Sequence, residues 1–306
     1  MKNLTPLVSI VITTKNEEKN IENCLISIQK QTYQNTEIIV VDNSSSDKTK
    51  ELSLKYTKNI YNKGPERSAQ RNFGMIEKSN GFYVMFVDAD MMLGPYLVED
   101  CIKYLKDSSH IALHIPEIVL GTNYFSKVRR FERSFYDGTV IDGARFFIKK
   151  DFNSVGGFDE NMSGPEDWDI DKKIKKIGSI GVVKSIDRDL AEWSLFTFIL
   201  DRGVIANKSS NGVFHNESDF ILKDYLKKKY YYSKSFNTYI KKWGKNDIDI
   251  QRQFGLIYRY FFVFLENSKY KKILAHPLLV FGMYFLRVLT GLTYIYRNFL
   301  QAKGVK

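Results

Sequence analysis

The chain has little of three residue types that shape small or secreted proteins. Its 306 residues include two cysteines, four histidines and six prolines. Cys24 and Cys101 both lie in helix-like segments, so we expect no disulfide framework and a reducing compartment. We find no internal repeat or low-complexity linker, and the first apolar run continues into a strand pattern, so no signal peptide is expected. With 43% hydrophobic residues, the chain can bury one sizeable core and keep an appendage.

The most informative segment is an apolar run that ends in two carboxylates. Residues 82–87 can form a buried strand, and Asp88 and Asp90 follow with Ala89 between them. Carboxylate oxygens suit Mg²⁺ or Mn²⁺, and such a metal can also hold phosphate oxygens. An isolated Asp-X-Asp is more often a polar turn, so its interpretation depends on the surrounding sequence.

Strands and helices alternate around this segment. The pattern predicts strands over 7–14, 37–42, 59–61 and 82–88, and helices over 17–31, from the cap cluster 43–47 to about 56, and over 67–78. This alternation indicates an α/β fold whose sheet is mostly parallel and covered on both faces. Ligands of such sheets bind beyond the carboxyl ends of the strands, so Thr13, Asp42 and Asp88 should converge on one crevice.

Six short motifs follow one another along the chain. They are VSIVITTKNE at 8–17, VVDNSSSD at 40–47, SAQRNFG at 68–74, FVDAD at 86–90, GGFDE at 156–160 and GPEDWD at 164–169. In residues and in order they resemble the family 2 glycosyltransferases of the GT-A fold, over roughly residues 7 to 216. Each motif alone is weak, but six in order are strong because a chance match would have to reproduce the intervals as well.

The resemblance implies a GT-A fold, in which a mixed, mostly parallel sheet is flanked by helices. It also implies an inverting, metal-dependent enzyme that uses a nucleotide-sugar, bound by residues 1–110, with the acceptor bound by residues 111–218. The expected donor-binding residues are Thr13, Asn16, Glu17, Asp42, Asn43, Arg71, Asp88, Ala89 and Asp90. Amide and carboxylate oxygens can accept from a base N–H, and the Arg71 guanidinium would complement phosphate oxygens. The 43–47 loop is equally suited to cap a helix, and Asn43 stands where family members often carry an aspartate, which leaves the nucleobase open.

The motif at 164–169 begins a predicted helix whose first turn is acidic. Negative charge is favoured at that end of a helix, so capping is one role for Glu166 and Asp167. The resemblance implies another: Asp167 is the general base, which takes the acceptor hydroxyl's proton as its oxygen attacks the anomeric carbon. No enzyme nucleophile is required. Further acceptor-site candidates are Asp142, Gly143, Asp159, Glu166 and Trp168.

His215 follows a strand-like stretch, and a lone histidine is more often structural than ligating. Several members of the resembled family place a histidine here to complete the metal site. The expected cofactor is therefore Mn²⁺ or Mg²⁺, held by Asp88, Asp90 and His215. The other histidines, His110, His114 and His276, match nothing catalytic.

Much of the net charge of +11 lies beyond residue 218. Segments 223–234 and 241–245 interleave lysine with tyrosine or tryptophan, which suits an anionic membrane surface, nucleic acid or a solvated helix face. The apolar segments 277–286 and 288–296 favour the membrane, but Arg287 between them makes a membrane span costly. We expect residues 219–306 to form helices on the bilayer surface, with a single span or a soluble helical subdomain as alternatives. The basic residues expected at the headgroups are Arg287, Arg297, Lys303 and Lys306.

The sequence thus predicts an enzyme peripherally bound to the cytoplasmic face of the cell membrane. Its expected partners are a UDP-sugar donor, a lipid-linked glycan or polysaccharide precursor as acceptor, and an anionic membrane surface, with no nucleic acid. A sugar nucleotidyltransferase would need a Gly-rich basic loop after its first strand, which this chain lacks. A polyprenyl-phosphate sugar synthase would use the same Asp88 and Asp90 but would not need Asp167, because a lipid phosphate requires no deprotonation. A non-catalytic membrane or nucleic-acid binding module would leave the acidic motifs without a role.

Overall fold

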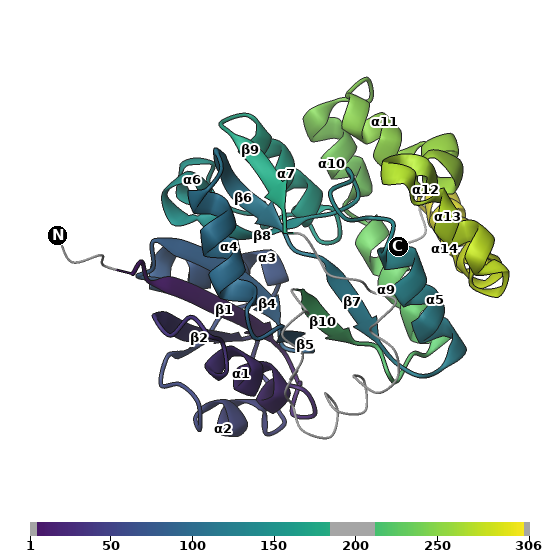
Figure 1. Ribbon diagram of the computed structural model, residues 1–306. Coiled ribbons are helices and arrows are strands. Elements are labelled where there is room, and N and C mark those ends of the chain that lie inside the picture. The colour runs from purple at the N-terminus through teal and green to yellow at the C-terminus, as the bar shows by residue number, and fades with distance from the viewer. Residues whose placement is uncertain (1–4, 184–211, 303–306) are drawn as a thin grey trace.

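The computed structural model describes residues 5–183 and 212–302, which are built around one large sheet (Figure 1). Its strand order is β3-β2-β1-β4-β8-β6-β9. The strands are β1 (Val8–Thr14), β2 (Thr36–Asp42), β3 (Ile60–Asn62), β4 (Tyr83–Asp88), β6 (His110–His114), β8 (Ala144–Ile148) and β9 (Ser179–Val182). In this sheet β8 runs antiparallel to β4 and β6, and the other neighbouring strands are parallel. The predicted mixed, mostly parallel sheet is confirmed.

Helices cover both faces of the sheet. Because successive side chains of a strand point to opposite faces, Ile10 and Ile12 of β1 pack with α1 (Ile21–Gln29) and α4 (Leu97–Lys106). Val11 packs on the other face, with residues of the π-helix η1 (Phe73–Lys78), α6 (Lys149–Ser154) and α7 (Glu166–Lys175). Every residue of β1 is therefore buried, as a central parallel strand requires.

The predicted helices exist, and two of them, α1 and α2, are shorter than predicted. Two short helices, α2 (Thr49–Ser53) and α3 (Arg67–Asn72), complete the first half of the chain. The helix predicted over 67–78 is α-helical only to Asn72 and continues as η1. It lies tightly on the sheet, because a Cβ at Gly74 would come within 2.3 Å of Val11 and 3.1 Å of Val41.

A second, three-stranded sheet joins distant parts of the chain. Its order is β5 (Met91–Leu93), β10 (Val213–Asn216) and β7 (Glu117–Leu120), and β10 is antiparallel to β5 and parallel to β7. In this register His215 lies opposite Met91. The second sheet therefore carries His215 to the turn that contains Asp90.

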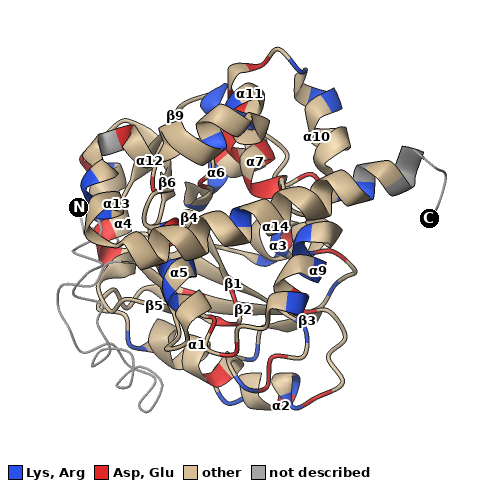
Figure 2. Ribbon diagram, turned by 90° about the vertical axis from the view of Figure 1, so that its right-hand side faces the viewer, with Lys and Arg blue, Asp and Glu red and all other residues tan. Residues whose placement is uncertain are grey.

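Residues 219–302 are mainly helical, as predicted. The elements are α9 (Leu222–Ser233), α10 (Phe236–Trp243), α11 (Ile248–Phe254), the π-helix η3 (Tyr258–Phe262), α12 (Val263–Leu265), the 3₁₀ turn η4 (Glu266–Ser268), α13 (Tyr270–Ala275) and α14 (Pro277–Ala302). The two apolar segments form the single helix α14, which runs across α9 and α5 (Tyr124–Arg133) (Figure 2). Helices α10 and α11 also contact the sheet domain: Lys242 of α10 pairs with Asp169 at 2.9 Å, and Asp247, which caps α11, pairs with Lys172 at 2.6 Å.

The expectation for the arginines of α14 was wrong. Arg287 is 6% exposed and pairs with Glu132 of α5 at 3.2 Å, and it also donates to the Tyr136 hydroxyl. Arg297 is 3% exposed and donates to the Ser233 carbonyl of α9. Both guanidinium groups find acceptors inside the protein, so they do not extend toward headgroups. Lys303 and Lys306 lie outside the described residues.

The segment Pro277–Arg297 is long and apolar enough to cross a membrane by length and composition, which alone is weak evidence. The buried Arg287–Glu132 pair holds one face of α14 on the protein. Removing one partner of a buried pair typically costs about 3–5 kcal/mol, so detaching this face would be expensive. The packing therefore favours a helix that lies along the protein surface.

Candidate active site

A cleft of about 900 Å³ opens beyond the carboxyl ends of β1 and β4. It is where most of the predicted site residues meet. Those lining it are Thr13, Glu17, Asn43, Arg71, Asp88, Ala89, Asp90, Asp142, Gly143, Asp167, Trp168 and His215. Residues from both halves of the sheet domain thus converge, as expected for the strand ends of an α/β sheet.

Asn16 and Asp42 do not line the cleft. Asn16 is exposed, and its Oδ1 accepts from the Ser46 backbone N–H at 2.9 Å. Asp42 is fully buried and accepts from the Ser45 backbone N–H at 2.8 Å. Asp42 thus lies opposite Thr14 at the end of β2, as expected, but its carboxylate is buried and organises the loop after β2.

Asp159 and Glu166 also lie away from the cleft lining. Asp159 pairs with Lys242 of α10 at 2.8 Å. Glu166 is fully buried and pairs with Arg67 at 2.8 Å; burial raises the pKa of Glu166, and Arg67 opposes the rise. Both acids therefore hold elements together at the back of the site.

Arg71 connects the two carboxylates with the most specific predicted roles. Its guanidinium is 1% exposed and lies 3.1 Å from Asp88 Oδ1 and 2.9 Å from Asp167 Oδ1. Thr13 also donates to Asp88 Oδ1 at 3.0 Å. Burial opposes ionisation of Asp88, but the charges of Arg71, Arg67 and Arg145 together outweigh it and hold the pKa of Asp88 below its usual value. Arg71 thus contacts two carboxylates, and its phosphate contact stays a prediction.

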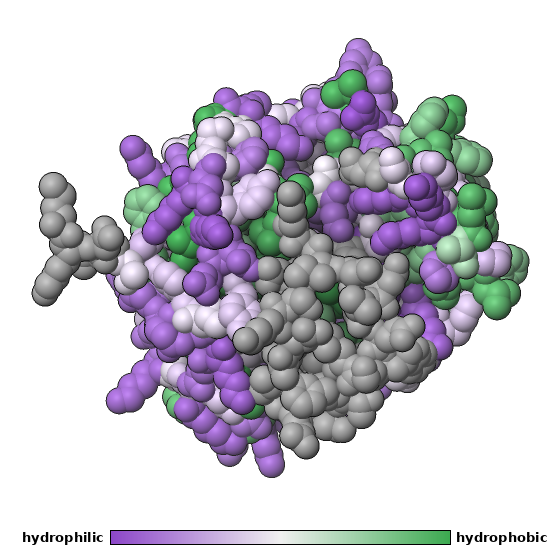
Figure 3. Space-filling view, in the orientation of Figure 1, coloured by the Kyte–Doolittle hydropathy of each residue, from purple (hydrophilic) through white to green (hydrophobic). Residues whose placement is uncertain are grey.

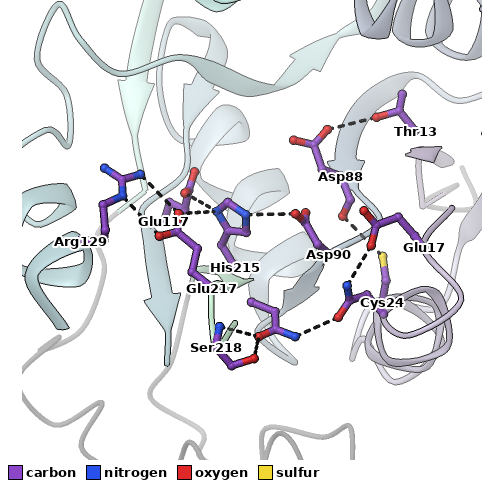
Figure 4. A network of polar contacts seen from close by, with 12 residues as sticks. Thr13, Glu17, Cys24, Asp88, Asp90, Glu117, Arg129, His215, Glu217 and Ser218 are labelled. Carbon is purple, nitrogen blue, oxygen red and sulfur yellow. Dashed lines mark hydrogen bonds and ion pairs between the residues drawn. The ribbon is translucent and has the colours of Figure 1, made fainter. Parts of the chain in front are cut away.

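Asp90 and His215 meet directly (Figure 4). His215 Nε2 lies 3.1 Å from Asp90 Oδ2, and its Nδ1 lies 2.9 Å from Glu117 Oε1. Burial alone would lower the pKa of His215, but Asp90, together with Glu117, raises it to about 10. The ring is therefore protonated here and donates to both carboxylates.

These residues fit a divalent cation without forming a complete ligand set. Among residues 5–183 and 212–302, no group of three or more His, Cys, Asp or Glu side chains is placed to hold a metal ion. Asp88 is turned toward Thr13 and Arg71, but Asp90 Oδ1 is buried and has no hydrogen-bond partner in the described structure. A buried carboxylate oxygen of this kind needs a partner. A cation there would take the place of the Nε2 proton of His215.

Asp167 lies where α7 begins, against a glycine. A Cβ at Gly143 would come within 2.7 Å of Asp167 Cβ, so only glycine leaves room for this carboxylate. Asp167 remains 32% exposed in the cleft, and Arg71 binds its Oδ1. The adjacent Trp168 donates to the Ile141 carbonyl at 3.0 Å and stacks on Phe236, which ties the cleft to the C-terminal helices.

Several site residues were missed by the sequence analysis. Glu117 orients His215, yet it stands in an unremarkable apolar strand and no local pattern distinguishes it. The lysine- and tyrosine-rich segment 223–234 was noticed but assigned to a membrane surface, whereas helix α9 lines the cleft with Tyr225, Lys228, Lys229, Tyr231 and Tyr232. The alternation of lysine and tyrosine in this segment was the signal that could have indicated its place in the cleft.

Residues 9–158 match the protein-family model of Glycosyl transferase family 2. This match covers just under half of the chain, and over these residues the chain is similar to that family. The matched part extends from β1 into the 156–160 motif and includes Asp88 and Asp90. The predicted resemblance is confirmed.

Curated relatives share this domain. The putative glycosyltransferase EpsH of Bacillus subtilis is 30% identical over 115 residues, which are 36% of this chain and 33% of EpsH. The chondroitin synthase of Escherichia coli is 27% identical over 197 residues, which are 59% of this chain and 28% of that protein. The chain thus spans about a third or less of the length of these two relatives.

A solved structure shares the fold along nearly the whole chain. It is the mannosyltransferase PcManGT from Pyrobaculum calidifontis in complex with GDP-Man and Mn²⁺. The TM-score is 0.59 at 15% identity, and the match covers 96% of this chain and 88% of that one. At this identity the likeness shows the fold, and the predicted GT-A fold is confirmed.

A second buried histidine allows a pH test of the region around the site. His114 Nε2 lies 2.6 Å from Asp171 Oδ2, and Nδ1 lies 3.4 Å from Asp142 of the cleft. Burial would lower the pKa of His114, but Asp171 and then Asp142 raise it from 6.5 to about 9. The stabilisation is therefore complete below about pH 6.5 and is lost as the pH rises through about 9.

We predict that the free energy of unfolding of the wild type exceeds that of His114→Gln most at low pH. Denaturant titrations of both proteins between pH 6 and 9.5 should show this difference shrinking steadily above pH 6.5. His110→Gln is the matched control, because its ring bonds Ser179 Oγ and no carboxylate in the described structure. A difference that is constant across this pH range would contradict the assignment.

Proposed function

We propose that the chain is an inverting glycosyltransferase that moves a sugar from a nucleotide-sugar to a hydroxyl of a lipid-linked glycan or cell-surface polysaccharide precursor. The supporting observation is that Arg71 joins Asp88 and Asp167 within one cleft, beside the Asp90–His215 pair. Groups suited to a diphosphate and to an acceptor hydroxyl thus lie side by side. The relation to chondroitin synthase and the GDP-Man complex of PcManGT agree with this chemistry.

The donor would lie across the strand ends. Thr13, Glu17 and Asn43 line the part of the cleft nearest β1 and β2, where they can bind the nucleoside. Asp90 and His215 would hold Mn²⁺ or Mg²⁺, with Glu117 orienting the histidine ring through Nδ1. Such a cation supplies positive charge that stabilises the departing diphosphate. We propose a UDP-sugar as the donor, and the activity assay described below also includes GDP-sugars.

The acceptor would be activated by Asp167. Its Oδ1 is held by Arg71, and Oδ2 makes no hydrogen bond among the described residues. As the acceptor oxygen bonds to the anomeric carbon, the bond from that carbon to the diphosphate breaks and the hydroxyl proton passes to Asp167. Attack opposite the leaving diphosphate inverts the configuration, and no covalent enzyme intermediate forms.

We further propose that the enzyme lies on the cytoplasmic face of an anionic membrane. Figure 3 shows hydrophobic side chains gathered over the end of the molecule that carries α12 to α14. The exposed apolar residues of α14 recur every three or four positions, at Leu278, Phe281, Phe285, Val288, Leu292, Ile295 and Phe299. This spacing forms one continuous apolar face, which suits an interfacial helix.

The first prediction from this function concerns Asp90. Asp90→Asn should abolish the Mn²⁺-dependent binding of UDP and GDP, because the amide removes the charge that attracts the cation, and thermal unfolding should stay close to wild type. Calorimetry with each nucleotide, with and without Mn²⁺, measures the effect. Asp159→Asn is the control, since that carboxylate binds Lys242 away from the cleft. Metal-dependent affinity that survives in Asp90→Asn would rule out this site.

A second prediction separates base catalysis from donor binding. Asp167→Asn should reduce turnover by about 10² to 10⁴-fold, the usual effect of losing a positioned proton acceptor, with nucleotide affinity nearly unchanged. A panel of UDP- and GDP-sugars, assayed for release of nucleoside diphosphate on acceptor-bearing membranes, supplies the substrate. Transfer at a near wild-type rate would mean that the base lies elsewhere or that the acceptor is a lipid phosphate.

A third prediction concerns the membrane. The full chain should sediment with vesicles that contain anionic lipid, and high salt should release it only partly, because apolar burial is not screened. The double variant Phe281→Asp, Leu292→Asp should lose the salt-resistant fraction. Lys106→Glu on α4, which changes the net charge by the same amount, should keep it. If the wild type ignores such vesicles at low salt, the membrane proposal fails.

A further inference from the structure

The cleft continues past His215 into a part lined by basic side chains. This cationic arm consists of Arg129 and Arg133 of α5, Lys228 and Lys229 of α9, and Arg259 of η3. Figure 4 places Arg129 on the side of His215 opposite Asp88 and Thr13. Arg129 therefore lies away from the strand ends proposed to bind the nucleoside, whereas Lys228 lies at the boundary between the two parts, where it interacts with Asp90.

The cationic arm has more positive than negative groups. Arg129 pairs with Glu132 at 2.8 Å and with Glu217 at 3.3 Å. Arg133 pairs at 3.1 Å with Glu117, which also bonds Arg145 and His215. The carboxylates are thus already shared among several cations.

Three members of the arm have no carboxylate partner. Within the described residues, Lys228, Lys229 and Arg259 make no ion pair, and Arg259 Nη1 is buried with no hydrogen-bond partner. Lys229 and Arg129 instead both contact the ring of Tyr225, each at 5.2 Å from its centre. Two like charges are therefore held close to one another on the same wall.

This arrangement costs stability in the ligand-free protein. Burial, followed by Arg129 and Arg133, lowers the pKa of Lys229 to about 7, and burial lowers the pKa of Arg259. Lys229 and Arg259 are both partly buried. Partly buried cations without partners are costly, and they are typical of sites where a ligand supplies the opposite charge. The missing partner is an anion with several acceptor oxygens, since lysine and arginine donors converge on it.

The cationic arm also adjoins apolar surface. Thr290, Gly291 and Tyr294 of α14 line the same cleft, together with Leu256, which is 73% exposed. The apolar face of α14 begins beside them. A ligand anchored in the arm can therefore extend an apolar chain toward α14, where Arg287 in the same lining is already paired with Glu132.

We propose that the cationic arm binds the phosphate or diphosphate group of a lipid whose chain leaves the protein along α14. This inference rests on the proposed function, because it identifies what links the acceptor glycan to its lipid. The anion in the arm would position the acceptor so that its sugar hydroxyl reaches Asp167.

Calorimetry on the full chain tests the proposal with three soluble probes: octyl phosphate below its micelle concentration, inorganic phosphate and octanol. Octyl phosphate should bind more tightly than either of the others, because it combines the anion with an apolar chain. Lys229→Gln and Arg259→Gln should each weaken its binding by about tenfold to a hundredfold, the loss expected for a hydrogen bond to a charged group. Lys227→Gln, on the same helix but outside the cleft lining, should leave it unchanged.

A stability measurement guards against variants that merely unfold. Because Lys229 is held beside like charges, Lys229→Gln should melt at or above the wild-type temperature while losing affinity for octyl phosphate. Equal affinities for octyl phosphate and inorganic phosphate would overturn the lipid assignment, and equal affinities for octyl phosphate and octanol would overturn the anion site. Unchanged binding in both charge variants would overturn the proposal altogether.

Competition with nucleotide separates this inference from the proposed function. UDP or GDP with Mn²⁺ should not displace octyl phosphate; displacement would mean that the arm holds the donor's diphosphate, and the inference fails. Lys229→Gln should retain Mn²⁺-dependent nucleotide binding. If no nucleotide-sugar is turned over but octyl phosphate still binds through Lys229 and Arg259, the proposed function fails and the anion site stands.

Discussion

The site depends on one buried cation. Arg71 is held between Asp88, which ends β4, and Asp167, which lies in the first turn of α7. Its guanidinium also lies 3.9 Å from the centre of the Phe86 ring. An uncompensated charge at this depth would be strongly destabilising. Arg71 therefore needs the negative charges of Asp88 and Asp167, and the two carboxylates need its positive charge. Two carboxylates with different proposed tasks are thereby fixed relative to each other, and the central sheet is locked to the helix on its face.

The parts of the fold that the sequence predicted well are those governed by local pattern. Strands β1, β2 and β4 were predicted to within about a residue, since each is an apolar run that a turn or carboxylate ends. The convergence of Thr13 and Asp88 followed from strand direction alone. The direction of a side chain such as that of Asp42 could not be predicted in this way, because it depends on which backbone N–H groups the following loop offers as hydrogen-bond donors. Glu117 was missed for a related reason: its partner His215 is 98 residues away.

The C-terminal helices contribute to the cleft as well as to the surface. Composition placed a boundary near residue 218, where lysine and aromatic residues increase. In the structure, however, α9 lines the cleft and Trp168 stacks on Phe236 of α10. Arg287 was misplaced by the same compositional argument, since an arginine within an apolar helix can be satisfied by a neighbouring helix as well as by water. A sequence pattern gives the composition of a segment, but the packing of the fold determines which residues that segment contacts.

The second sheet determines when the Asp90–His215 pair can form during folding. Asp90 and His215 are separated by 125 residues, and β10 brings them together by pairing with β5. Contacts of such long sequence separation pay a large loop-closure entropy and form late during folding. A nascent chain whose β10 is still within the ribosome has the β4 carboxylates but not the histidine. It can build much of the central sheet and still lack the Asp90–His215 pair.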